Sequence, residues 1–431
     1  MTALLKYSWL CLASGMLVQA NCQDSFARPV FAAIDKNDDG LRALNREIWE
    51  NPETAFQEFH AHKVLTDYLE EQGFNVTRNA HGLETSFRAE YSNGGGRTVS
   101  FNSEYDALPG IGHACGHNLI AVAGVGAAIG VKEALENHNL KGRVVLLGTP
   151  AEEGGGGKIK MLEAGAYDDV DCSLMTHPGN SWYSNYAPSL ASWRANVTWT
   201  GYGAHAALSP WQGRNALDGF VSAYTMTALY RQQMRPDERI HHVIVDGSGM
   251  IPNQIPDYIR AVWGARASTL ESRSRLVDQV YDIVEASAKA TNTSVDLVPF
   301  QDYWNLVPNQ ALSYQYYHNH MTYFDPTKNN ATAGFQNDHP DKEIESGGAA
   351  ASSDQGNVSW KVPAIQTGFP IGGSAPNHNS GFTELAGTDF AHRQAMISGK
   401  TLAMTGIEVL RNETFAKLIW EEWRELVGSQ Q

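Results

Sequence analysis

Residues 98–153 contain the pattern that most constrains the fold, a strand, a loop, a helix, a strand and a second loop. Apolar runs at 98–102 and 143–148 predict the two strands, and the alanine-rich stretch 119–136 predicts the helix. This alternation is typical of an α/β fold with a central, mostly parallel sheet between helices. Ligands of open α/β sheets bind at the carboxyl ends of strands, so the two loops are the expected place for a site.

A different order follows residue 188. Strand-like and helix-like runs alternate as β-α-β-β-α-β, which is the ferredoxin-like arrangement. The runs are 193–200, 216–232, 241–245, 258–266, 270–290 and 293–299. We therefore expect an inserted α+β domain at 188–304, within a catalytic domain formed by 25–187 and 305–431. Outside the insertion, the pattern predicts helical residues 28–72 with a break at Asn51-Pro52, a strand at 363–368 and a largely helical stretch at 383–411.

The first loop ends in Cys115-Gly116-His117. A thiolate and an imidazole two residues apart in a turn can face one small cation, and this donor pair suits zinc or a neighbouring transition metal. The pair alone does not define a site. Further ligand types follow at Glu152-Glu153, His177 and His378, so the combination predicts an enzyme with a metal-activated water.

Glu152 and Glu153 follow the second strand directly. Adjacent carboxylates repel one another, and at a strand end they normally face solvent. Beside a cation, however, one carboxylate can bind the metal while its neighbour moves the proton of the attacking water. The glycines at 154–157 with Lys158 imitate a phosphate-binding loop, but Ile159 stands where Ser or Thr is needed. We expect these glycines to let the backbone pass close to the metal cluster.

The N-terminus has the pattern of a signal peptide, residues 1–20. Lys6 precedes an apolar stretch at 7–18, and Val18-Gln19-Ala20 is an acceptable cleavage site. A buried N-terminal helix is the alternative. Export would place the protein outside the cell as a secreted glycoprotein, and six sequons fit that expectation: Asn75, Asn196, Asn292, Asn330, Asn357 and Asn412.

After removal of Cys11 with the signal peptide, three cysteines remain, so at least one lies outside a disulfide. If Cys115 binds metal, Cys22 and Cys172 either pair or stay free. The net charge of −15 disfavours a nucleic-acid partner. We expect no membrane partner, because the sequence shows no stretch approaching the roughly 20 apolar residues that span a bilayer.

Several motifs together resemble the M20 family of metallopeptidases, in its amidohydrolase branch, over residues 30–410. The resemblance rests on segments 47–53, 106–109, 113–118, 149–155, 201–206, 352–359 and 377–380. Asn118 replaces the Asp usual in auxin-conjugate hydrolases and resembles a group whose members cleave dipeptides and related amides. The resemblance implies a hydrolase of the aminoacylase type.

Carried onto this sequence, the family pattern implies roles for individual residues. The metal ligands would be Cys115, His117, Glu153, His177 and His378. Glu152 would be the general base, and Asp106 would orient a ligand imidazole. The family commonly holds two Zn²⁺ or Mn²⁺ ions with one bridging ligand, for which Cys115 is the candidate. Glu104 stands where other branches place a His ligand, which leaves one or two ions per subunit open.

The inserted domain of the family forms a homodimer and supplies a His to the transition state, often across the interface. His205 matches that residue, and Asn253 and Arg266 match residues that grip the substrate carboxylate. The implied function is a secreted metal-dependent amidohydrolase of N-acyl amino acids or dipeptides. Two alternatives are a broader metallocarboxypeptidase acting on peptides and a catalytically silent binding protein. The intact Glu152 disfavours the binding protein, which needs no base.

Overall fold

The computed structural model describes residues 25–180, 182–248, 251–347 and 351–428. The predicted signal peptide and Cys22 lie outside these residues. Helical structure covers residues 25–36 and continues in α2 (Asp38–Glu50), and the chain then turns at Asn51-Pro52 as expected before α3 (Phe59–Glu71).

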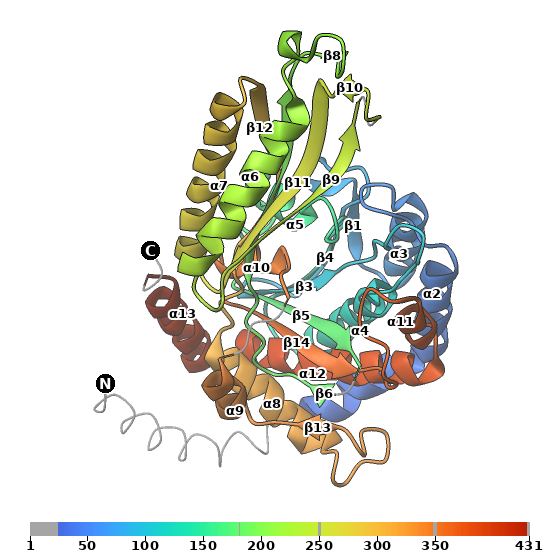
Figure 1. Ribbon diagram of the computed structural model, residues 1–431. Coiled ribbons are helices and arrows are strands. Elements are labelled where there is room, and N and C mark those ends of the chain that lie inside the picture. Colours follow the sequence, from blue (N-terminus) through green and yellow to red (C-terminus); the bar gives the residue numbers. More distant parts are fainter. Residues whose placement is uncertain (1–24, 181, 249–250, 348–350, 429–431) are drawn as a thin grey trace, which may run out of the picture.

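A six-stranded sheet forms the centre of the larger part of the molecule, in the order β1-β2-β4-β3-β5-β14 (Figure 1). The four strands β4, β3, β5 and β14 are mutually parallel, and β1 and β2 form an antiparallel edge. The predicted α/β fold with a mostly parallel sheet is therefore confirmed. The strand bounds are β1 Asn75–Arg78, β2 Phe87–Ser92, β3 Thr98–Ser103, β4 Arg143–Gly148, β5 Cys172–Gly179 and β14 Ala364–Pro370.

Strand β4 shows why this sheet is covered on both faces. Val144 and Leu146 pack into the main core, whereas Val145 and Leu147 pack into a second core with Met161. Successive side chains of a strand point to opposite faces, so a continuous apolar run requires a cover on each side. One face carries α4 (His117–Asn137) and α12 (Asp389–Arg411), and the other carries α5 (Gly157–Glu163) and α10 (Gln355–Ser359).

Contrary to the sequence-based expectation, one described helix, α4, is long and apolar enough to cross a membrane by length and composition. Its most apolar window has a mean hydropathy of 1.5, but 89% of that window is buried. Such burial is typical of a core helix. The remaining elements around the sheet are β6 Trp182–Tyr183, α8 Gln310–Phe324, β13 Gln336–Asn337, α9 Pro340–Ser346, α13 Glu413–Gly428 and the 3₁₀ turn Ala80–Gly82.

The stretch 383–411 is largely helical, as expected. Two helices occupy this stretch, α11 (Ser380–Ala386) and α12. The Thr388 side chain accepts a hydrogen bond from the Ala391 backbone N–H and so caps a new helix start. Gly387 precedes it, and a Cβ there would lie 2.5 Å from the Trp49 ring.

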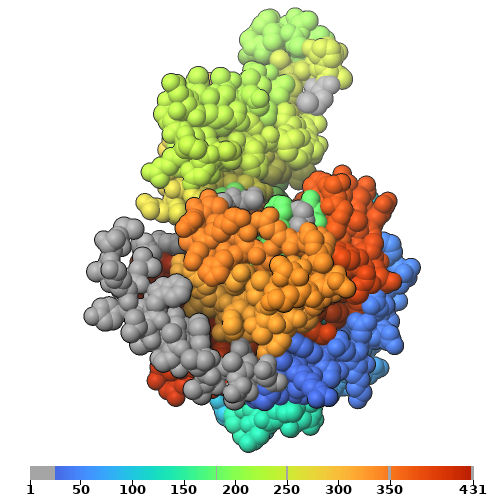
Figure 2. All heavy atoms as spheres, turned by 90° about the horizontal axis from the view of Figure 1, so that it is seen from below, coloured from blue at the N-terminus to red at the C-terminus, as the bar shows by residue number. Residues whose placement is uncertain are grey.

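The inserted unit has its own four-stranded antiparallel sheet, in the order β12-β7-β11-β9, and two helices that cover one face. This order is that of the ferredoxin-like arrangement. A separate core of side chains such as Trp199 and Trp263 joins the sheet to the helices. In space-filling view the unit protrudes as a lobe from the larger body (Figure 2). Its elements are β7 Ala191–Thr200, α6 Ala216–Tyr230, β9 Arg239–Gly247, β11 Tyr258–Ala267, α7 Leu270–Ala290 and β12 Ser294–Tyr303.

A small antiparallel pair, β8 (Ala204–His205) and β10 (Gln254–Ile255), forms the tip of this lobe, at the end of the sheet farthest from the body (Figure 1). Two 3₁₀ turns, Pro210–Gln212 and Arg231–Gln233, complete the lobe.

Glu58, just before α3, fixes the loop that follows β4. Its fully buried carboxylate accepts hydrogen bonds from the backbone N–H of Ala151 and of Phe56, each at 2.9 Å, and from the Thr85 hydroxyl at 2.8 Å. Ala151 has a φ of +60°, a conformation that costs a residue with a side chain about 1–3 kcal/mol. Burial, and then the charge of Asp106, raises the pKa of Glu58 to about 7.

Replacing Glu58 with Gln should change how the free energy of unfolding depends on pH. The folded protein holds the Glu58 proton up to about pH 7, whereas the carboxyl of the unfolded chain releases it near 4.5. Wild-type stability should therefore fall as pH rises through this window, by up to about 3 kcal/mol from this group. Glu58→Gln cannot titrate. Urea unfolding should show that the free energy of unfolding of Glu58→Gln, relative to that of the wild type, is about 1–3 kcal/mol higher at pH 8 than at pH 5. Parallel pH profiles of the two proteins would contradict the assignment.

Candidate metal centre

The loop after β3 and the end of β5 meet at Gly116 and Pro178. Gly116 has a φ of +77°, and a Cβ there would lie 2.5 Å from Pro178 Cγ, so only glycine allows this approach. The contact brings Cys115 Sγ to 3.4 Å from His177 Nε2. The other ring nitrogen of His177, Nδ1, lies 2.9 Å from the Pro178 carbonyl and donates to it, which leaves Nε2 free to bind a cation.

Asp106 connects two of the expected ligands. One carboxylate oxygen lies 3.0 Å from His117 Nδ1, and the other accepts the backbone N–H of Glu153 at 2.9 Å. A carboxylate on the second ring nitrogen is the usual companion of a metal-bound imidazole. Burial alone would lower the pKa of His117, but Asp106 and Glu104 outweigh it and hold this pKa well above its ordinary value.

Glu153 and His378 form the open side of the centre. His378 Nε2 lies 3.1 Å from Glu153 Oε1, and the His378 side chain is 56% exposed. His378 is held at a φ of +64°, with its backbone N–H bonded to the Ala114 carbonyl at 2.8 Å. Burial opposes ionisation of Glu153, but the His378 hydrogen bond and the charge of His117 outweigh burial and lower the Glu153 pKa.

The five expected ligands lie together in two overlapping groups. Cys115, His117 and His177 form one, and Cys115, Glu153 and His378 form the other, with the ligand atoms of each group within 4.8 Å of one another. Burial raises the pKa of Cys115 to about 12, so its thiolate needs a cation beside it. Sulfur, imidazole and carboxylate donors in this number fit two divalent ions that share Cys115.

Glu152 lies beside these groups without belonging to either. Its buried carboxylate forms a third group with Glu104 and His117, also within 4.8 Å. Burial, and then the charges of Glu104 and Glu153, raises the Glu152 pKa well above its ordinary value. Neighbouring carboxyls whose pKa values shift in opposite directions are typical of an acid–base residue next to a ligand.

Tyr303, the last residue of β12, fixes the Glu152 loop from the inserted unit. Its hydroxyl donates to the Glu152 carbonyl and accepts the Gly156 backbone N–H at 3.1 Å. The sequence does not predict this contact of Tyr303, because a tyrosine at a strand end carries no local signal of it.

Lys158 and Asp354 were also missed. Lys158 Nζ lies 2.5 Å from Glu104 and 2.7 Å from Asp354, and all three side chains are completely buried. The glycines before Lys158 follow the expected ligand Glu153 directly, so their closeness to a bound metal stays a prediction. They also shape the turn into α5, since a Cβ on Gly157 would lie 1.8 Å from the Pro150 carbonyl oxygen. The sequence signal for this buried ion pair was a lysine placed among glycines and apolar residues.

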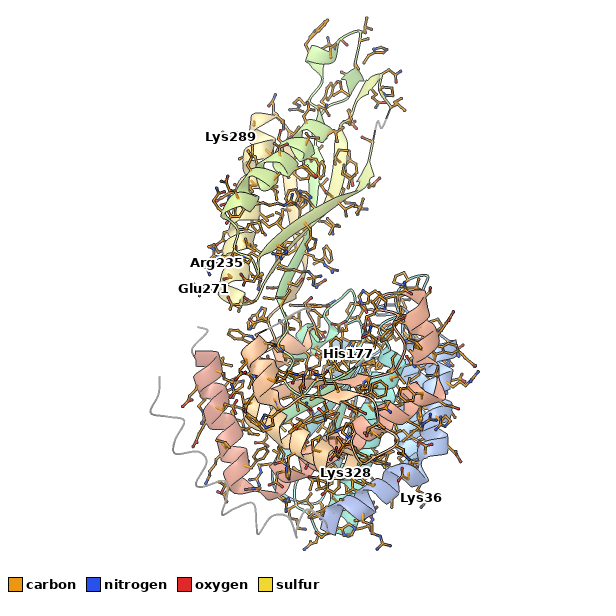
Figure 3. All side chains as sticks on the ribbon, turned by 60° about the horizontal axis from the view of Figure 1, so that its bottom comes forward. Lys36, His177, Arg235, Glu271, Lys289 and Lys328 are labelled. Carbon is orange, nitrogen blue, oxygen red and sulfur yellow. The ribbon has the colours of Figure 1, made fainter. Side chains whose placement is uncertain are left out.

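The residues expected in the inserted unit lie at its two ends. Arg266 is at the base, where its guanidinium bonds the Ser352 hydroxyl at 3.2 Å. His205 and Asn253 are at the tip, where the Ala206 backbone N–H bonds the Asn253 carbonyl at 3.0 Å and His205 is exposed. Figure 3 labels His177 in the body, on the side that faces the lobe. Within one chain, the structure therefore does not bring His205 or Asn253 to the ligands.

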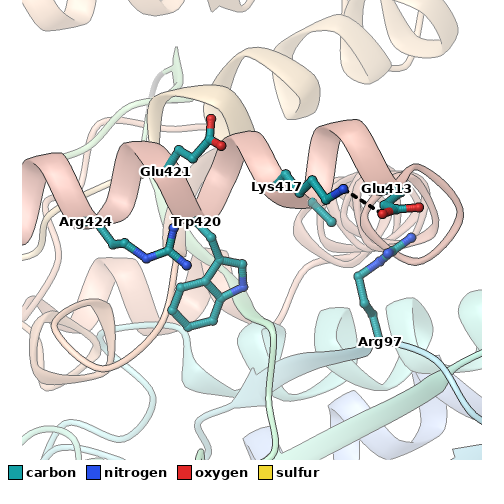
Figure 4. A pocket seen from close by; sticks show the side chains of 7 residues that line it. Arg97, Glu413, Lys417, Trp420, Glu421 and Arg424 are labelled. Atoms are coloured by element: carbon teal, nitrogen blue, oxygen red, sulfur yellow. Dashed lines mark ion pairs between the residues drawn. The ribbon is translucent and has the colours of Figure 1, made fainter.

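Another hollow, of about 470 Å³, lies along α13 (Figure 4). It is lined by Arg97, Trp420 and charged side chains that include the pair Lys417–Glu413 at 2.7 Å. Arg97 precedes β3, whereas the ligand loops follow the carboxyl ends of the strands. This hollow is therefore at the opposite edge of the sheet from the metal centre.

Comparisons with known proteins agree with this centre. The model of peptidase family M20/M25/M40 matches residues 100–387. The chain is 39% identical over 403 residues to the Xaa-Arg dipeptidase of Mus musculus, covering 91% of this chain and 90% of that protein. It is 29% identical over 456 residues to a subunit of the p-aminobenzoyl-glutamate hydrolase of Escherichia coli, covering 92% and 95%.

Among solved structures, a dinuclear metal-binding M20 peptidase of Bacillus subtilis matches with a TM-score of 0.61 and 18% identity, covering 87% of this chain and 99% of that chain. This likeness concerns the fold. The matched family model and the curated relatives show that the chain belongs to peptidase family M20/M25/M40 and is a metal-dependent hydrolase of the amidohydrolase type.

Proposed function

We propose that this chain hydrolyses the amide bond of dipeptides or N-acyl amino acids, with two divalent cations and Glu152 as general base. The observation that carries the proposal is the pair of ligand groups that share Cys115, with a buried carboxylate of raised pKa beside them. Because the relative from Mus musculus is named an Xaa-Arg dipeptidase, we expect dipeptides with a basic residue on the carboxyl side to be the preferred substrates.

Divalent cations, when bound, would polarise the amide carbonyl and lower the pKa of the attacking water from about 15.7 toward 7. Glu152 takes the proton of that water and later gives it to the leaving amine nitrogen. A carboxyl whose pKa is raised by burial and by Glu104 holds this proton between the two steps. Asp106 keeps His117 and the Glu153 backbone in place during the reaction.

Arg266 would bind the free carboxylate of the substrate. Burial, and then the charge of Arg194, lowers the Arg266 pKa. An anion placed near the two guanidinium groups would therefore stabilise both of them. A guanidinium can hold a carboxylate by two parallel hydrogen bonds. This contact would favour amides of amino acids over neutral esters.

Removal of the metal and replacement of the two carboxylates test the proposal. Dialysis against a chelator should abolish hydrolysis of Ala-Arg, and Zn²⁺ or Mn²⁺ should restore it.

Glu152→Gln should keep the metal content and lower kcat at least about 10²-fold, the usual scale of a general base. Glu153→Gln should instead lower the metal content measured by mass spectrometry. Exchanged phenotypes would show that the base and the ligand were assigned the wrong way round.

The position of His205 supports a homodimer in which the tip of one subunit completes the site of the other. Strand β9 is an edge strand of the inserted sheet, with Val243 and Val245 exposed. The adjacent helix α6 exposes Val221, Tyr224 and Leu229. Apolar side chains beside an open sheet edge favour pairing with a second copy.

Mixed dimers test the shared site. His205→Ala and Glu152→Gln subunits should each be inactive alone, because each lacks one group of the reaction. After subunit exchange, some mixed dimers contain one site with both residues intact, so activity should return. Exchange demonstrated by mass spectrometry without recovered activity would place His205 within its own subunit's site or outside the reaction.

We also propose that the chain is exported, from its N-terminal pattern and sequons. The described structure separates the sequons by exposure. Asn75, Asn292 and Asn330 are exposed, Asn196 and Asn412 are half-buried, and Asn357 is buried with its amide donating to the Asp302 carbonyl at 3.1 Å.

Protein from a secreting eukaryotic host should begin near Asn21 and carry glycans on the exposed sequons but none on Asn357. Intact mass before and after glycosidase, with peptide mapping, measures both. A chain that retains residues 1–20 without sugar would refute export, and a glycan on Asn357 would contradict the structure around it.

A further inference from the structure

The environment of Glu104 is not explained by the five-ligand centre. Glu104 lies two residues before Asp106 in the loop after β3, and its side chain is completely buried. Oε1 accepts the Lys158 ammonium at 2.5 Å, whereas Oε2 makes no hydrogen bond. Instead, Oε2 lies 3.4 Å from His117 Nε2, which also makes no hydrogen bond.

Two polar atoms without a hydrogen bond therefore face one another in the interior. When His117 binds a cation, its neutral imidazole carries its proton at Nδ1, against Asp106, and presents a lone pair at Nε2. A lone pair facing a carboxylate oxygen without a hydrogen bond requires a positive charge between them. Zinc bonds to nitrogen and to oxygen are each about 2.1 Å, and a tetrahedral angle then separates the two ligand atoms by about 3.4 Å. The observed separation fits one cation bound by both atoms.

Lys158 does not supply that charge. Its ammonium is shared between Glu104 Oε1 and Asp354 Oδ1, at 2.5 and 2.7 Å, so two carboxylates surround one cation. The Lys158 backbone N–H also bonds Asp354, at 2.9 Å, which fixes the lysine from both ends. The arrangement holds Glu104 rigidly and leaves one negative charge of the group uncompensated.

We propose that Glu104 is a further ligand of the cation bound by His117, with Oε2 as the donor atom, and that Lys158 and Asp354 position its carboxylate. The inner ion would then have Cys115, His117, His177 and Glu104 as its ligands. Cys115, Glu153 and His378 would hold the outer ion, on the side where His378 is exposed and where substrate would have room. This inference rests on the two-cation site of the proposed function.

A crystal structure of the wild-type protein with Zn²⁺, located by anomalous scattering, tests the proposal directly. We expect Glu104 Oε2 at about 2.0–2.2 Å from the ion on His117. A distance beyond 3 Å, with both ions present, would overturn this proposal and leave the proposed function standing. Absence of any ion on Cys115 and His117 would overturn both.

Glu104→Gln provides a test in solution, with Glu422→Gln as a matched control. Glu422 is a half-buried carboxylate that accepts the backbone N–H of Ala311 at 2.9 Å, but it lies on α13, away from the centre. Competition with a chromophoric chelator should show the affinity for one of two ions falling at least about 10-fold in Glu104→Gln only.

With Co²⁺, the ligand-field bands should shift while the thiolate charge-transfer band of Cys115 remains. Unchanged affinity and unchanged ligand-field bands in folded Glu104→Gln would overturn the proposal. If this variant does not fold, the wild-type crystal structure still decides the question.

Discussion

An excess of carboxylates over cationic side chains at the carboxyl edge of the central sheet is the constraint on which the site depends. Five carboxylates lie in or beside the ligand groups: Glu104, Asp106, Glu152, Glu153 and Asp354. The Lys158 ammonium lies between two of them, Glu104 and Asp354. Isolated charges in the interior cost several kcal/mol each, so such an arrangement is stable only with bound cations or protons. Metal binding and folding of this edge are therefore coupled.

The parallel sheet explains how this excess is assembled. The candidate ligands come from the loops after β3, β4 and β14 and from the end of β5, which meet because these strands run in the same direction. Close backbone contacts then fix the loops to one another. Gly116 lies against Pro178, the His378 N–H bonds the Ala114 carbonyl, and Glu58 holds Ala151.

The inserted unit contacts the surroundings of the centre through its base, whereas its tip lies away from the ligand groups. Through Tyr303 and Arg266 its base contacts the Glu152 loop and the segment before Asp354 within the same chain. Its tip, with His205 and Asn253, lies at the other end of a sheet whose longest strands have ten residues. A strand of that length spans about 33 Å. The base therefore fixes the Glu152 loop, and the exposed tip agrees with the homodimer proposed above.

The sequence by itself determined the elements and the types of ligand. Strand β4 and helix α7 have the predicted bounds, because apolar periodicity and turn residues are local signals. Only the tertiary structure decided which charged groups surround the centre. Glu104 and Lys158 are 54 residues apart, and Lys158 and Asp354 are 196 apart, so no local pattern connects them. Likewise, His205 lies within a motif that the sequence shows, at residues 201–206. Its distance from the ligand groups, however, depends on the length and direction of the inserted sheet. Side-chain chemistry can be read from local sequence, whereas the electrostatic balance of a buried site depends on contacts between distant segments.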